Sequence, residues 1–85
     1  MPSAHLPAEV TVRYWAGARA AAGIESERVA AGTVGEVIEQ LRDRHTGLGP
    51  VLAVASFLVD GVARDRNAEV PAGSTLEVLP PFAGG

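Results

Sequence analysis

The C-terminal residues carry the clearest chemical signal in this sequence. The chain ends in Pro80-Pro81-Phe82-Ala83-Gly84-Gly85. Two prolines favour a stiff, extended backbone outside a sheet ladder, and glycines accept almost any backbone angles. These residue types suit a terminus that enters a narrow channel in another protein. The reactive group is then the α-carboxylate of Gly85, which ATP could convert to an acyl-adenylate and sulfur could convert to a thiocarboxylate.

Other residue types that support catalysis are absent or scattered. The sequence has no cysteine and no lysine, which excludes a thiol nucleophile and a Schiff base. His5 and His45 lack the spacing of metal ligands. We find no Ser/His/Asp arrangement, no phosphate-binding glycine loop and no carboxylates paired for acid–base work. We therefore expect a chain that is not an enzyme by itself and that binds no metal or cofactor.

Charge and hydropathy argue against two classes of binding partner, nucleic acids and membranes. The net charge of −3 argues against nucleic-acid binding, which usually needs a basic face. No apolar run approaches the roughly 18 residues that span a bilayer, and residues 1–12 lack the basic start of a signal peptide. We expect a cytoplasmic protein with no membrane partner.

The sequence pattern predicts one main helix. Thr33 and Glu36 have the spacing of a capping box. An apolar stripe at helical spacing follows, formed by Val34, Val37, Ile38 and Leu41. The helix should end near His45, whose side chain we expect to interact with the terminal carbonyls.

Strands surround this helix in the sequence. Period-two patterns and turn residues predict strands at Glu9–Ala16, Ser26–Ala31, Ser56–Val59, Val62–Arg64 and Thr75–Leu79. Asp60-Gly61 is a hairpin turn signal. Ala18–Ala22 could form one helical turn, and Val51–Ala55 fits either a strand or a helix.

The order of these elements defines the fold class. One helix can cover only one face of one sheet, so we expect an α+β protein. We divide the chain into a loose N-terminal extension at residues 1–8, one domain at residues 9–79 and an extended tail at residues 80–85.

The element order and the ending Leu79–Gly85 resemble the ubiquitin-like sulfur carriers, most of all the small subunit of molybdopterin synthase. The segment Val10–Ala16, followed by Arg19 and Gly23, is similar to that family's first strand and short helix. The resemblance covers roughly residues 9–85, and the tail is its sharpest motif. It implies a ubiquitin-like β-grasp fold, in which a mixed sheet carries one main helix on one face and ends in a flexible Gly-Gly tail.

The resemblance also implies a function. A ubiquitin-activating-type adenylyltransferase would use ATP to adenylate Gly85, and a sulfur-donor protein would supply the thiocarboxylate sulfur. The tail would then enter the large subunit of molybdopterin synthase, with Gly84 allowing close approach. There the sulfur would pass to a cyclic pterin in molybdenum cofactor biosynthesis, with catalytic residues supplied by that subunit.

Strand phase predicts a docking face beside the tail. Trp15 and Leu79 fall opposite the helix-covered face, and the first and last strands are neighbours in this fold class. An exposed apolar patch there would bind partners, with Arg19 at its edge. We expect the interface to continue along Pro80, Pro81, Phe82 and Ala83. The alternative is that Trp15 packs against a loop or the N-terminal extension.

Three other functions stay open at this stage. A thiocarboxylate carrier could serve thiamine, cysteine or secondary-metabolite pathways. A ubiquitin-like modifier would join Gly85 to lysines of target proteins. A plain interaction domain would not use Gly84 and Gly85 at all.

Overall fold

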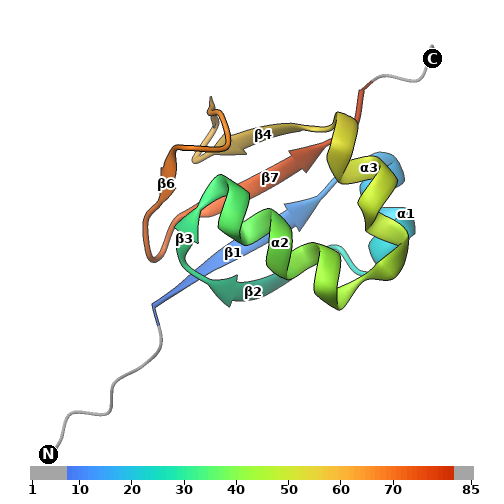
Figure 1. Cartoon of the computed structure of the whole chain (residues 1–85), viewed down its shortest axis with the longest axis horizontal. Coiled ribbons are helices and arrows are strands. Elements are labelled where there is room, and N and C mark those ends of the chain that lie inside the picture. Colours follow the sequence, from blue (N-terminus) through green and yellow to red (C-terminus); the bar gives the residue numbers. More distant parts are fainter. Residues whose placement is uncertain (1–7, 82–85) are drawn as a thin grey trace, which may run out of the picture.

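The computed structural model describes residues 8–81 of the chain. Its centre is a five-stranded mixed sheet in the order β2-β1-β7-β4-β5 (Figure 1). The strands are β1 (Glu9–Tyr14), β2 (Ser26–Ala30), β4 (Ser56–Val59), β5 (Val62–Ala63) and β7 (Thr75–Leu79). The expected α+β class with a mixed sheet is confirmed.

The two middle strands, β1 and β7, run parallel although they lie at opposite ends of the sequence. Thr11 pairs with Thr75, and Tyr14 pairs with Val78. Every other neighbouring pair in this sheet is antiparallel. The parallel pairing therefore brings the carboxyl-terminal ends of β1 and β7 to the same end of the sheet.

Helix α2 (Val34–Arg44) crosses one face of the sheet (Figure 1). Its capping box is present, because the Thr33 hydroxyl accepts from the Glu36 N–H at 3.1 Å and the Glu36 carboxylate accepts from the Thr33 N–H at 2.8 Å. The predicted apolar stripe is buried at Val34, Val37, Ile38 and Leu41. The helix ends at Arg44, as expected.

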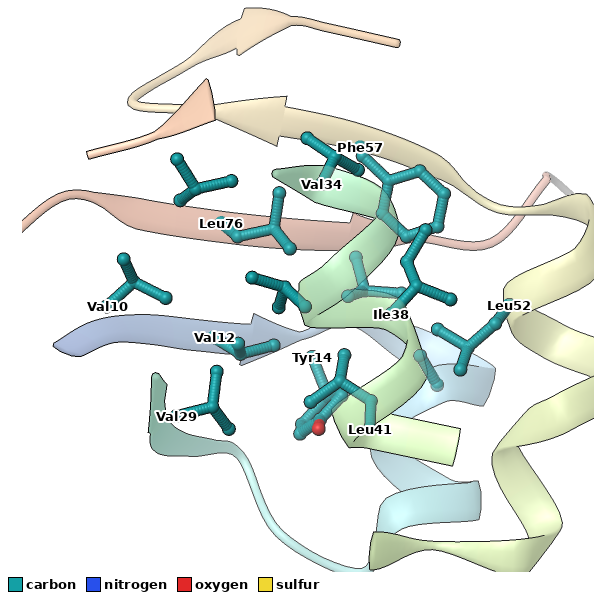
Figure 2. Close-up of a cluster of buried hydrophobic side chains, with 14 of the residues drawn as sticks. Val10, Val12, Tyr14, Val29, Val34, Ile38, Leu41, Leu52, Phe57 and Leu76 are labelled. Atoms are coloured by element: carbon teal, nitrogen blue, oxygen red, sulfur yellow. The ribbon is translucent and has the colours of Figure 1, made fainter. Parts of the chain in front are cut away.

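The core lies between α2 and the sheet. Figure 2 shows side chains from the sheet and the helices filling one space. Its labelled members include Val10, Val12, Tyr14, Val29, Ile38, Leu41, Leu52, Phe57 and Leu76. Burying one such aliphatic side chain contributes about 1.5–3 kcal/mol. This packing makes the sheet a rigid support for the residues at its ends.

Further elements extend the predicted order. Helix α1 (Ala16–Ala22) is longer than one turn, and a short 3₁₀ helix (Thr46–Leu48) leads into α3 (Gly49–Val54). The ambiguous segment is thus mainly helical, because Pro50 is tolerated in a first helical turn and Leu52 is buried. None of the helices within residues 8–81 is long and apolar enough to cross a membrane.

A second, two-stranded sheet holds the start of α2. It pairs β3 (Gly32–Thr33) with β6 (Glu69–Val70). The Val34 and Gly35 N–H groups donate to the carbonyls of Ala68 and Arg66, at 2.9 and 3.0 Å. Two-residue strands have no useful periodicity, which explains why the sequence did not predict them.

The prediction for the His45 side chain is wrong. Its Nε2 lies 2.6 Å from the Glu27 carboxylate on β2. The same carboxylate accepts from the Tyr14 hydroxyl and, at 3.0 Å, from Arg44. Burial would raise the pKa of Glu27, but the hydrogen bonds from Tyr14, His45 and Arg44 outweigh it and lower that pKa. A half-buried acceptor on β2 therefore attracts His45 away from the helix end.

This cluster predicts a pH-dependent stability. Because the folded pKa of Glu27 is lowered from 4.5, its contribution is complete above that value and is lost as the pH falls through the folded pKa. Glu27→Gln should lose about 1–3 kcal/mol of unfolding free energy at pH 7. Urea unfolding should show the difference from wild type shrinking below pH 4.5.

Glu39→Gln is the matched control, because Glu39 is exposed and its ion pair with Arg42 is long, at 3.7 Å. Its unfolding free energy should follow the wild-type pH profile. An unchanged pH profile in Glu27→Gln would contradict the role assigned to this carboxylate.

Candidate functional site: the base of the C-terminal tail

The candidate site is the end of the sheet where β1 and β7 both stop. The Trp15 backbone N–H donates to the Val78 carbonyl at 3.2 Å, which places Trp15 beside Leu79. After Leu79 the chain continues through Pro80, which is half-buried, and Pro81, which is exposed. The predicted tail residues Phe82, Ala83, Gly84 and Gly85 lie outside the described residues, as does most of the predicted N-terminal extension.

Two charged side chains hold the Trp15 indole at the surface. Its Nε1–H donates to the Glu77 carboxylate at 3.1 Å. The Arg13 guanidinium carbon lies 4.6 Å from the ring centroid. A cation over an exposed aromatic face contributes roughly 0.5–1 kcal/mol. Trp15 remains 36% exposed, so it is oriented without being covered.

Strand register brings Arg13 and Glu77 to this position. They are direct partners across β1 and β7. Arg13 lies two residues before Trp15, which directly follows β1, and Glu77 lies two residues before Leu79, the last residue of β7. All four side chains therefore share the sheet face that α2 does not cover. Sequence reasoning missed Arg13 and Glu77, although the same period-two count that placed Trp15 could have found them.

The backbone turns sharply just after Trp15. Ala16, the first residue of α1, has φ 47°, a left-handed conformation that is unfavourable for a residue with a Cβ by roughly 1–2 kcal/mol. Strain of this kind persists only where the surroundings enforce it. Here the Trp15 N–H bond to β7 and the start of α1 fix the turn and leave the indole on the surface.

The patch is smaller and more polar than predicted. Leu79 is half-buried and pairs with Ser56 of β4. Arg19 is exposed one turn into α1, and no ion pair of its side chain occurs within residues 8–81. The structure therefore places Trp15 beside Leu79, which leads into Pro80, and leaves Arg19 on the adjoining helix α1. The interface role of all four residues stays a prediction.

The described chemistry at this face is that of a binding surface. Trp15 offers an exposed aromatic ring, Arg13 a guanidinium group and Glu77 a carboxyl group. No group of three or more His, Cys, Asp or Glu side chains within residues 8–81 could hold a metal ion. What the face can do is dock a protein beside the chain segment that leads to residue 85.

Comparisons with known proteins agree with this geometry. The sequence profile of the ThiS family matches residues 12–85. Among solved structures, SAMP1 from Haloferax volcanii has 25% identity and a TM-score of 0.81, covering 91% of this chain and 99% of its own. A putative molybdopterin converting factor subunit 1 from Pyrococcus furiosus has 25% identity and a TM-score of 0.79, covering 87% and 98%.

A third similar structure is a complex. The Amycolatopsis orientalis BexX/CysO structure contains a chain with 30% identity and a TM-score of 0.77, covering 89% of this chain and 99% of that one. No curated protein gave a significant match. The ubiquitin-like β-grasp fold is thereby confirmed, and a similar chain is known in complex with another protein.

The contacts that orient the Trp15 ring can be tested by fluorescence, because Trp15 is the sole tryptophan of the sequence. Glu77→Ala removes the acceptor of the indole N–H, so the ring should move more freely. We expect a lower steady-state anisotropy of Trp15 emission, with an unfolding free energy within about 1 kcal/mol of wild type. Glu39→Ala, an exposed glutamate on α2, should leave the anisotropy unchanged. Equal anisotropy in Glu77→Ala and wild type would show that Glu77 does not orient the ring.

Proposed function

Because the chain belongs to the ThiS family of ubiquitin-like sulfur carriers, we propose that it carries sulfur as the small subunit of molybdopterin synthase. In this proposal Gly85 is the attachment site, and Gly84 lets it enter the active site of the large subunit. The chain itself supplies no catalytic residue. The product of the synthase would be molybdopterin, which is made in molybdenum cofactor biosynthesis.

One observation carries the proposal. The central strand β7 runs out of the sheet at Leu79 directly into Pro80 and Pro81, at the end where Trp15 is displayed. A partner that covers the Trp15 face would therefore meet the start of the tail. The family match that extends to residue 85 supports a functional role for the glycines.

The proposed chemistry has two steps before transfer. A carboxylate oxygen of Gly85 attacks the α-phosphorus of ATP, and pyrophosphate leaves with formation of the acyl-adenylate. Hydrosulfide delivered by a donor protein then attacks the acyl carbon, and AMP leaves. Loss of the remaining S–H proton gives a thiocarboxylate on Gly85. An adenylyltransferase of the ubiquitin-activating type would hold the ATP, so this chain needs no bound cofactor.

A second acceptor pathway has a specific observation in its favour. The similar chain in the BexX/CysO complex is 30% identical, against 25% for the molybdopterin converting factor. A carrier for another sulfur pathway is therefore the alternative, with the same chemistry at Gly85. A protein modifier is the other alternative, since one similar structure is a small archaeal modifier protein.

Intact-mass measurement tests the chemistry at Gly85. The full chain is incubated with an adenylyltransferase, ATP and a sulfide donor, with a known carrier verifying that the enzyme is active. We expect replacement of one terminal oxygen by sulfur. A chain without Gly85 should stay unmodified. An unchanged wild-type mass in the presence of the active enzyme would refute the carrier function.

The acceptor is tested separately. Thiocarboxylated chain mixed with a large molybdopterin synthase subunit and the cyclic pterin should yield molybdopterin. Sulfur loading without transfer, combined with copurification of a different synthase, would favour the alternative pathway. Ladders of conjugates on immunoblots would favour a modifier.

Removing the exposed ring tests the docking face. Trp15→Ala should weaken binding to the large subunit by about 2 kcal/mol, because exposed tryptophans are frequent hot spots. Val62→Ala is the control, since Val62 is 58% exposed but lies on β5 near the opposite end of β4. Titration calorimetry measures both. A thermal melt that collapses in Trp15→Ala, with unchanged affinity at lower temperature, would show that Trp15 serves packing instead.

A further inference from the structure

The two edges of the main sheet differ in how their backbone groups are hydrogen-bonded. At the β2 edge, side chains from α2 bond these groups. The Gln40 side chain on α2 donates to the Ala30 carbonyl at 2.9 Å and accepts from the Ala30 N–H at 3.1 Å. Arg44 donates to the Arg28 carbonyl at 3.2 Å. These side chains occupy the outward backbone groups of β2 as a neighbouring strand would. An added strand would have to displace them.

The opposite edge is open beyond β5, which has only two residues. The Arg64 N–H donates to the Phe57 carbonyl at 3.0 Å. The reciprocal bond, from the Phe57 N–H to the Arg64 carbonyl, is not formed within residues 8–81. Since Asp60 N–H bonds to Thr75 of β7, alternation along β4 turns the backbone groups of Phe57 away from β7 and toward this open edge.

An open groove of about 450 Å³ lies along this edge. Its apolar lining comes from Ala53, Ala55, Phe57 and Ala63. Its polar lining comes from Ser56, Arg64, Asp65 and Arg66, so two arginines face one carboxylate there. The loop that carries the arginines is anchored, because the Arg66 carbonyl accepts from Gly35 N–H at the start of α2. The groove is thus formed by fixed elements.

The groove has a local positive charge on an acidic chain. Within residues 8–81, neither Arg64 nor Arg66 has a carboxylate within 4.0 Å. Asp65, which lies between them, accepts from the Asn67 N–H at 2.9 Å and so is engaged in its own turn. An extended segment with acidic side chains would complement both the two guanidinium groups and the backbone N–H of Phe57.

We propose that this groove binds an acidic, extended segment of a partner protein by strand addition to β4. The Phe57 N–H would donate to a carbonyl of the segment, and Arg64 and Arg66 would pair with its carboxylates. Ser56 also lines the groove and is the register partner of Leu79, so the bound segment would lie next to the base of the tail. This surface is separate from the Trp15 face and from the chemistry at Gly85.

An NMR titration of the full chain tests the proposal. The probe is the blocked peptide acetyl-Val-Glu-Val-Glu-amide, and acetyl-Val-Lys-Val-Lys-amide is its charge-reversed control. We expect the acidic peptide to shift the amide signals of Phe57 and Arg64 saturably, and the lysine peptide to leave them in place. Raising the salt concentration should weaken the binding, because the arginines are exposed.

Variants separate the two parts of the proposal. Replacing both Arg64 and Arg66 by Gln should weaken peptide binding about three- to tenfold. Arg42→Gln removes an arginine from α2 and should bind as wild type. If the double variant does not fold, the single variant Arg64→Gln provides the same comparison. Retained affinity in the arginine variants, equal binding of the lysine peptide, or no shift of Phe57 would each overturn the proposal.

The outcome is independent of sulfur loading. A chain without Gly84 and Gly85 should bind the acidic peptide with unchanged affinity although it cannot be thiocarboxylated. Loss of peptide binding on that deletion would overturn the groove as a separate site. A chain that loads sulfur but binds no peptide would refute the groove and leave the carrier function intact.

Discussion

Parallel hydrogen bonding between β1 and β7 places the first and last strands side by side at the centre of the sheet. Three features depend on this pairing: the exposed position of Trp15, the contacts of Arg13 and Glu77 with its ring, and the point where the tail leaves the sheet. If β7 did not pair with β1 in this register, Glu77 would not lie opposite Arg13. Because Thr11 pairs with Thr75, the face that displays Trp15 depends on a contact between residues far apart in the sequence, and such non-local contacts slow folding.

A binding face gains from being fixed before its partner arrives. Binding loses free energy when mobile side chains must be ordered, by about 0.5–1.5 kcal/mol for each. The Glu77 hydrogen bond and the Arg13 stacking already restrict the Trp15 ring. The open groove along β4 has a comparable arrangement, since the loop with Arg66 is tied to α2. Both surfaces are thus held in place by contacts within the chain itself.

Much of this arrangement could be predicted from the sequence. The capping box at Thr33 and the apolar stripe fixed α2, and period-two alternation placed Trp15 on the free face. The contact between His45 and Glu27 could not be predicted, because it joins β2 to the end of α2 through tertiary packing. Arg13 and Glu77 looked like ordinary surface charges until strand register joined them. The identity of the sulfur acceptor cannot be predicted from these residues, because similar chains occur both as a putative molybdopterin converting factor subunit and in the BexX/CysO complex.

The closed β2 edge has a consequence for how substitutions on α2 should be read. Gln40 is a half-buried polar residue of α2 beside the apolar stripe, a position where the sequence pattern alone would accept almost any helix-forming residue. Yet its amide group occupies the backbone of Ala30, so its loss would expose strand hydrogen-bonding groups to other molecules. The harm from such a change would be sheet-to-sheet aggregation at high protein concentration, even in a chain whose melting temperature is hardly altered. Solubility, then, is decided on a helix surface that hydropathy alone would leave unconstrained.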